Sequence, residues 1–166
     1  MTIREFLATA YPRIVAAVTM VAGDRATAED AVQEALARAW ERSSRGETID
    51  SLPAWVARVA LNLSKSRLRS LRVESRARER LARPKSHDLD TAERLAIDGA
   101  LARLPRRQRE VTVLRYYLGM NVAETASTLR VSEGTVKTSL HRARTALAAA
   151  LGEPNAEEVA DGARAR

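Results

Sequence analysis

The sequence predicts an all-α protein of two small helical domains joined by a linker, with a helix-turn-helix in the C-terminal domain. Apolar residues recur at helical spacing through most of the 166 residues, and alternating valine- and isoleucine-rich stretches are missing. A polar tract containing Pro84 interrupts this pattern between residues 74 and 90. Two short amphipathic segments separated by a tight break lie at residues 121–147. We therefore expect domains at 1–73 and 91–151, a linker at 74–90 and a frayed tail at 152–166.

The first domain begins with two predicted helices. Apolar spacing predicts a helix over residues 3–21, which Pro12 should kink or restart and Gly23 should end. Residues 28–42 form the most regular amphipathic helix, and its polar side is acidic and carries glutamine. Periodicity alone favours a simple solvated face here. The alternative is a docking face for a basic partner helix, because such a stripe would serve poorly against DNA.

A polar loop over residues 43–52 precedes a long helix that Pro53 opens. Polar and basic residues on this helix recur at steps of four, three, four, three and four residues, which keeps them on one narrow strip. The strip contains Arg58, Asn62, Lys65, Arg69, Arg72 and Arg76. Five cations on one strip repel each other unless an anion lies along them, so we favour a polyanion such as a phosphate backbone. An ordinary arginine-rich surface helix is the alternative.

The second domain begins with predicted helices over residues 91–104 and from Pro105 to Gly119. Arg106, Arg107 and Arg109 cluster at the start of the second of these, where backbone N–H groups are also unpaired. This combination suits a phosphate group.

The helix-turn-helix is predicted from its caps. Asn121, with Glu124 three residues later, forms a capping box, and Ser132 can cap the second helix after a break at Arg130 and Val131. The second helix has an apolar stripe of Val136, Leu140, Ala143 and Leu147. Its opposite face carries Thr138, His141, Arg142 and Thr145, flanked by Lys137 and Arg144. A basic, hydrogen-bonding face of this kind fits a DNA major groove, although a plain surface helix of a bundle has a similar pattern.

The composition excludes several classes of site. The chain has no cysteine and two histidines, which argues against disulfides, thiolate chemistry and a zinc site. No nucleophile–base pair, glycine-rich phosphate loop or metal cluster is present, so we expect neither an enzyme nor a cofactor. The net charge of +7 is concentrated after residue 50, which favours a polyanionic partner. No apolar run spans a membrane and the N-terminus is a poor signal peptide, so we expect a cytoplasmic protein.

Three stretches in this order resemble the extracytoplasmic-function (ECF, group 4) sigma factors of the sigma-70 family of bacterial RNA polymerase. They are TAEDAVQEALARAW, LPAWVARVALNLSKSRLRSLR and LARLPRRQREVTVLRYYLGMNVAETASTLRVSEGTVKTSLHRARTAL. The resemblance implies that residues 1–73 are sigma region 2, which docks on core polymerase and opens the −10 promoter element. It implies that residues 91–151 are sigma region 4, which reads the −35 element. The polymerase would supply the catalytic Mg²⁺, and this chain the promoter recognition.

The resemblance also implies roles for individual residues. The expected contacts with the clamp helices of the largest polymerase subunit are Asp30, Gln33, Glu34 and Trp40. The expected −10 contacts are Arg58, Asn62, Lys65, Arg69 and Arg72. The expected −35 contacts are Ser132, Thr135, Lys137, Thr138, Ser139, His141, Arg142, Arg144 and Arg107. The flap of the second-largest subunit, promoter DNA and an anti-sigma factor complete the implied partners.

This chain departs from the family pattern in places. The family usually has arginine, or another strong hydrogen-bonding residue, where Ser139 or His141 stands, so the −35 sequence does not follow. It often has isoleucine at Thr125 and Ala126, which predicts looser packing of the first helix of the motif. The −10 helix offers one aromatic residue, Trp55; in the family the base pocket is often made by the preceding loop, here residues 46–52.

Two alternatives remain from the sequence. A helix-turn-helix regulator of the response-regulator effector type would share SEGTVKTSL, but residues 1–90 lack the βα-alternating pattern of a receiver domain. A helical adaptor for acidic partners would not need capped helices around a tight turn.

Overall fold

The computed structural model describes residues 5–75 and 92–152, and within these ranges every regular element is a helix. The predicted fold class is confirmed. Most of the predicted linker, the tail beyond residue 152, Arg76 and Pro84 lie outside the described residues. The chain divides into two compact units: the first contains the described elements up to residue 75 together with Ser127–Arg130, and the second contains the remaining elements.

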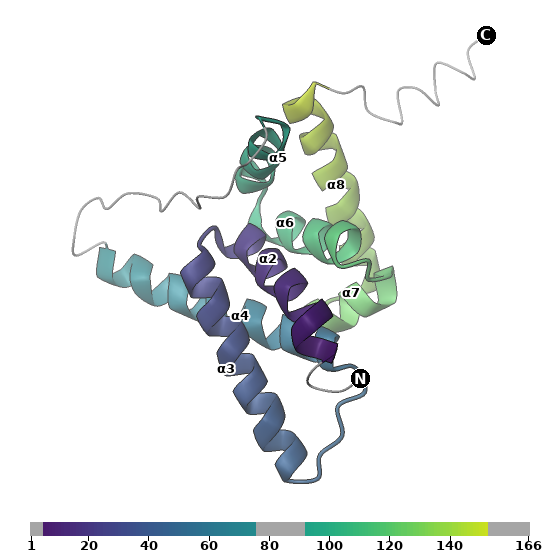
Figure 1. The fold of residues 1–166 in the computed structure, drawn as a ribbon. Helices are drawn as coiled ribbons and strands as arrows, with labels where there is room; N and C mark the ends of the chain where they lie inside the picture. Colours follow the sequence, from purple (N-terminus) through teal and green to yellow (C-terminus); the bar gives the residue numbers. More distant parts are fainter. Residues whose placement is uncertain (1–4, 76–91, 153–166) are drawn as a thin grey trace. The chain divides into compact units, whose positions relative to one another are not determined.

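The first unit consists of η1 (Phe6–Ala10), α2 (Tyr11–Ala22), α3 (Arg25–Ser44) and α4 (Leu52–Ser75), in which α2, α3 and α4 pack against one another (Figure 1). Its core is formed around Phe6, Val18, Val32 and Val56, all fully buried. The buried side of α3 is largely alanine, namely Ala28, Ala31, Ala35 and Ala39. Such small side chains allow neighbouring helices to approach closely.

Pro12 was expected to kink or restart the first helix; the structure instead has a π-helical turn just before it, and the backbone stays helical through Ala10 and Tyr11. Phe6–Ala10 is a π-helical turn, and α2 begins at Tyr11 with Pro12 in its first turn. Proline lacks a backbone N–H, and the π-helical turn directly before it shifts the hydrogen-bond register, with the Tyr11 N–H donating to the Phe6 carbonyl five residues earlier. Gly23 ends α2 with φ of 82°, as predicted, because glycine carries no Cβ that would clash in that conformation.

Helix α3 is capped by Asp24, whose carboxylate accepts a hydrogen bond of 2.7 Å from the backbone N–H of Thr27. Hydrogen bonds from the Thr27 side chain and backbone lower the pKa of Asp24 below its ordinary value of 3.8. The ionised carboxylate is therefore favoured in the folded chain, and it also suits the positive end of the helix dipole.

We expect Asp24→Ala to lower the free energy of unfolding by about 1 kcal/mol, because it leaves an N-terminal backbone donor of α3 without its cap. Urea denaturation at pH 7 followed by circular dichroism measures this. Asp24→Asn is the control, since it keeps an acceptor but cannot titrate. The contribution of the Asp24 charge should be present above pH 3.8 and disappear as the pH falls through the lower folded-state pKa. Equal acid sensitivity of the wild type and Asp24→Asn would contradict this assignment.

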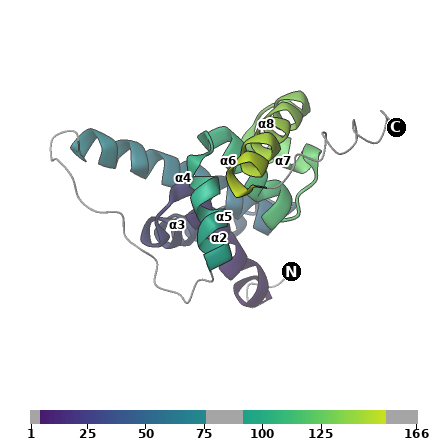
Figure 2. The same ribbon diagram turned by 90° about the horizontal axis from the view of Figure 1, so that it is seen from above.

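The second unit contains α5 (Ala92–Arg103), α6 (Arg106–Thr112), η2 (Val113–Tyr117), α7 (Val122–Leu129) as far as Ala126, and α8 (Glu133–Leu151) (Figure 2). Helices α5 and α6 both pack on α8. Leu101 and Leu104 meet Ala143, with Leu147 packed beside them. The predicted helix after Pro105 is present, but its second half is a π-helical turn ahead of Gly119, which has φ of 75°.

Candidate nucleic-acid interface

The helix-turn-helix has the predicted caps. At the start of α7, the Glu124 N–H donates to Asn121 Oδ1 at 2.8 Å and the Asn121 N–H donates to Glu124 Oε2 at 2.7 Å. Arg130 makes the turn with φ of 54°, and the Thr135 N–H donates to Ser132 Oγ at 3.1 Å to cap α8. Both helix starts are therefore fixed by capping side chains, as the sequence predicted.

The looser packing expected at Thr125 and Ala126 is not observed. Thr125 is fully buried, and Ala126 is nearly so. The Thr125 hydroxyl donates to the Asn121 carbonyl at 2.8 Å, which satisfies its polar group within the helix. Threonine thus fills this position without leaving an unpaired buried donor.

Helix α8 exposes most of the predicted −35 residues. The exposed members are Ser132, Thr135, Lys137, Thr138, His141, Arg142 and Arg144. Ser139 is a correction, because it is buried, at 9% exposure, on the side of α8 that also carries Val136 and Ala143. It lies three residues after Val136 and four before Ala143, so helical geometry turns it away from the exposed face.

The side chains on the exposed face differ in their free hydrogen-bonding capacity. Thr138 Oγ1 donates to the Gly134 carbonyl at 2.9 Å, so its one proton is already used. Lys137 Nζ lies 4.0 Å from Oε2 of Glu133, which is one turn earlier in α8. Arg142 makes no hydrogen bond or ion pair to the described part of the chain. All five N–H donors of Arg142 are therefore available to a ligand.

The arginines at the start of α6 are held within the second unit. Arg106 Nε lies 2.7 Å and an Arg107 nitrogen 3.0 Å from the carboxylate of Glu110, which is nearly buried. Arg109 donates to the carbonyls of Ala102 at 2.7 Å and Leu104 at 3.2 Å, which ties α6 to the end of α5. The predicted phosphate cluster is thus partly wrong, because Arg109 supports the α5–α6 corner. Arg107 is half-exposed and stays a predicted DNA contact.

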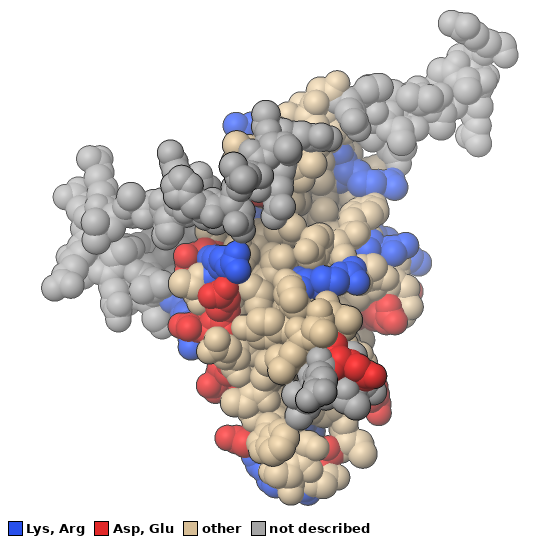
Figure 3. Space-filling view, viewed as in Figure 1, with Lys and Arg blue, Asp and Glu red and all other residues tan. Residues whose placement is uncertain are grey.

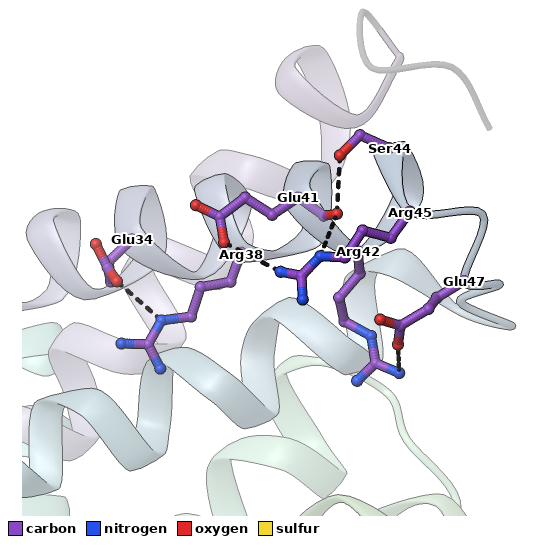
Figure 4. A network of polar contacts seen from close by, with 7 residues as sticks. All are labelled: Glu34, Arg38, Glu41, Arg42, Ser44, Arg45 and Glu47. Atoms are coloured by element: carbon purple, nitrogen blue, oxygen red, sulfur yellow. Dashed lines mark hydrogen bonds and ion pairs between the residues drawn. The ribbon is translucent and has the colours of Figure 1, made fainter.

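The predicted docking residues lie on α3. Asp30, Gln33 and Trp40 are exposed, and Glu34 is partly exposed. Glu34 pairs with Arg38 at 2.8 Å on the same helix, and Asp30 pairs with Arg67 of α4 at 3.1 Å (Figure 4 shows the Glu34 pair). Figure 3 shows acidic side chains over α3 and lysine and arginine side chains over α8.

The structure describes the side chains of only the first half of the predicted −10 strip. Asn62 and Lys65 are exposed on α4, and Arg58 is partly buried. The side chains of Arg69 and Arg72 lie outside the described residues. Sequence reasoning missed Arg42, whose guanidinium carbon lies 5.9 Å from the ring centroid of Trp55. No sequence signal joins these two residues, because the contact depends on how α3 meets α4.

None of the helices in the described residues is both long and apolar enough to cross a membrane. No group of three or more histidine, cysteine, aspartate or glutamate residues is gathered there as a metal ion would require.

Comparisons with known proteins identify the family. Residues 7–74 match the family model described as Sigma-70 region 2, and residues 94–147 match the model described as Sigma-70, region 4. The chain is 38% identical over 138 residues to the ECF RNA polymerase sigma factor SigL of Mycobacterium tuberculosis, covering 79% of this chain and 78% of SigL. It is 31% identical over 161 residues to the ECF RNA polymerase sigma factor EcfG of Rhodopseudomonas palustris, covering 95% and 89%.

A solved structure has the same fold. The sigma factor RpoE from Bartonella quintana, crystallised in complex with the anti-sigma factor NepR, superposes with a TM-score of 0.77 at 24% identity, over 90% of this chain and 95% of that one. The region 2 match also occupies the stretch where a response regulator would carry its receiver domain, so that alternative is not supported. The chain belongs to the ECF sigma factors, which direct bacterial RNA polymerase to specific promoters and initiate transcription there.

Proposed function

We propose that the two units divide the work of the sigma factor between them. Residues 1–73 act as region 2, with linker 74–90, and residues 91–151 act as region 4, followed by a tail at 152–166. The observation that carries the proposal is α8, the second helix of the helix-turn-helix. Helices α5 and α6 pack on it, and its exposed face is basic and rich in hydrogen-bond donors. In-vitro transcription with core polymerase and genomic DNA tests it: added chain should produce discrete start sites, and unchanged core transcription would refute it.

In region 4, we assign base reading to the middle of α8. Arg142 is the main candidate, because a guanidinium with free donors can bind the O6 and N7 atoms of guanine with two hydrogen bonds. Lys137 and Arg144 are better suited to phosphates, which position the helix without reading sequence. Thr138 would meet a base as an acceptor or through its methyl group, since its proton is committed to Gly134.

In region 2, we assign docking to α3 and −10 recognition to α4 with the preceding loop. The side chains of Asp30, Gln33, Glu34 and Trp40 suit a basic helical partner, with an apolar contact at the Trp40 end. Asn62 and Lys65 begin the −10 strip. We assign the reception of unpaired −10 bases to the loop at residues 46–52.

We expect Arg69→Ala with Arg72→Ala to weaken promoter binding and to flatten its salt dependence. Each lost phosphate contact should reduce the slope of log K against log salt concentration by about 0.7 to 0.9. Filter binding of the holoenzyme between low and physiological salt measures this, with Arg25→Ala on α3 as a control for the loss of an exposed arginine. An unchanged slope would remove these two arginines from the −10 strip.

The remaining proposals concern the cellular location of the protein and the partner that regulates it. We propose a cytoplasmic protein without catalytic groups of its own, because its proposed partners are the polymerase and the chromosome. We further propose that an anti-sigma factor restrains it, as the complex of the Bartonella quintana relative suggests. Because this chain has no cysteine, any thiol-based sensing would belong to that partner.

A further inference from the structure

Arg42, in the last turn of α3, joins three parts of the first unit. Its guanidinium forms an ion pair with Glu47, in the loop after α3, and lies over the ring of Trp55, in the first turns of α4. Its backbone carbonyl accepts hydrogen bonds from the N–H groups of Arg45 at 3.1 Å and Glu47 at 3.0 Å. Figure 4 shows the Arg42 side chain extending from α3 toward Glu47. The side chain and the backbone of Arg42 therefore both hold Glu47.

The two ends of the loop at residues 45–51 are fixed on either side of this contact. Gly46, with φ of 78°, donates its N–H to the Ser43 carbonyl at 3.0 Å and turns the chain out of α3. At the other end, Ser51 caps α4 by accepting from the N–H groups of Trp55 at 2.9 Å and Ala54 at 3.4 Å. Arg42 connects the first end, through Glu47, to the second end, through Trp55. We call Arg42, Glu47 and Trp55 the loop clasp.

The chemistry of arginine suits this role. A guanidinium is flat, so its edge can pair with a carboxylate while its face lies on an aromatic ring. Arg42 Nε is buried and has no hydrogen-bond partner in the described residues, so the carboxylate and the ring set the orientation of the group. With its guanidinium paired to Glu47 and its guanidinium carbon 5.9 Å from the Trp55 ring centroid, Arg42 is arranged to hold the loop and not to bind a phosphate.

We propose that Arg42 is a positioning residue for −10 recognition: through the loop clasp it holds residues 46–52 where unpaired bases of the opened promoter meet them. This inference rests on the proposed function of that loop. Without the clasp, the loop would sample other conformations. The entropy lost on ordering it would then weaken binding of the open strand. Arg42 itself would touch no DNA.

The experiment uses full-length chain assembled with core polymerase and a fork DNA whose −10 non-template strand is unpaired. The variants are Arg42→Gln, Glu47→Gln and the double change. Arg45→Gln is the matched control, because it removes the same charge from the same end of α3, where Arg45 pairs only with Glu41 at 3.6 Å among the ion pairs of the described residues. We expect Arg42→Gln and Glu47→Gln each to weaken fork binding by about three- to tenfold, and the double change to be no worse, since paired residues are not additive. Arg45→Gln should bind like the wild type.

Glu47→Gln separates positioning from simple electrostatics. Removing a negative charge next to DNA should strengthen binding if charge alone matters, and should weaken it if the clasp matters. Binding of core polymerase and of fully paired −35 DNA should stay within about twofold for every variant. Tighter fork binding by Glu47→Gln, or equal losses in Arg42→Gln and Arg45→Gln, would overturn the proposal.

Hydrogen exchange of the free chain gives an independent readout. The amides of Gly46 and Glu47 are bonded to the end of α3, so Arg42→Gln should accelerate their exchange while Arg45→Gln leaves it unchanged. Unchanged exchange in Arg42→Gln would also count against the clasp. A wild-type holoenzyme that does not prefer the unpaired fork to duplex DNA would instead refute the proposed function of the loop, and that result is read before any variant is compared.

Discussion

Replacing Gln33 with alanine together with Glu34 with lysine is expected to abolish binding to core RNA polymerase while leaving the fold intact. Both residues lie on the solvent side of α3, and Glu34 makes only a surface pair with Arg38 at 2.8 Å. Losing such a pair costs folding little, about 0.3–0.5 kcal/mol. Placing a cation against a basic partner helix costs about 2–5 kcal/mol of binding, or roughly a thirtyfold to several-thousandfold rise in Kd.

Pull-down of the core enzyme without DNA measures this effect, and circular dichroism with urea denaturation verifies the fold. Glu133→Lys is the matched control, because it makes the same charge reversal at an exposed position of α8, outside the proposed docking face. Retention of core polymerase by the double variant at wild-type levels would mean that docking uses another surface.

Arg142→Ala is expected to relax promoter specificity at one −35 position. Arg142 is exposed on α8 and makes no hydrogen bond or ion pair with the described residues, so truncating it should leave no buried partner unpaired. The loss of a two-hydrogen-bond base contact should remove about 1–3 kcal/mol of discrimination against the wrong base pair. The affinity for the preferred promoter should therefore fall by roughly 5- to 150-fold, whereas the affinity for promoters that already carry the wrong base pair should change little.

Competition binding of the holoenzyme to a set of −35 variants measures this discrimination. Lys137→Ala provides the comparison, because a phosphate contact should be lost equally on all sequences and should lower the salt slope. A uniform loss for Arg142→Ala would reassign it to the phosphate backbone.

The features predicted best from the sequence depend on residues close together in the chain. The capping box at Asn121 and Glu124, the cap at Ser132 and the helix ends at Gly23 and Gly119 all appear where the sequence placed them. Each arises from hydrogen bonds or backbone preferences within about four residues, so the local sequence contains the necessary information. The exposed face of α8 also followed from helical periodicity, whereas Ser139, which only the family resemblance added to the −35 contacts, is buried.

The sequence by itself determined the helical class, the helix-turn-helix and the basic and acidic faces, because each depends on spacing within one helix. Tertiary structure alone decided which charges are already partnered: Asp30 with Arg67 of another helix, Arg109 with the carbonyls of Ala102 and Leu104, and Arg42 with Glu47 and Trp55. Contacts between elements depend on where two helices meet and how their side chains pack there. Periodicity within each helix does not specify those positions.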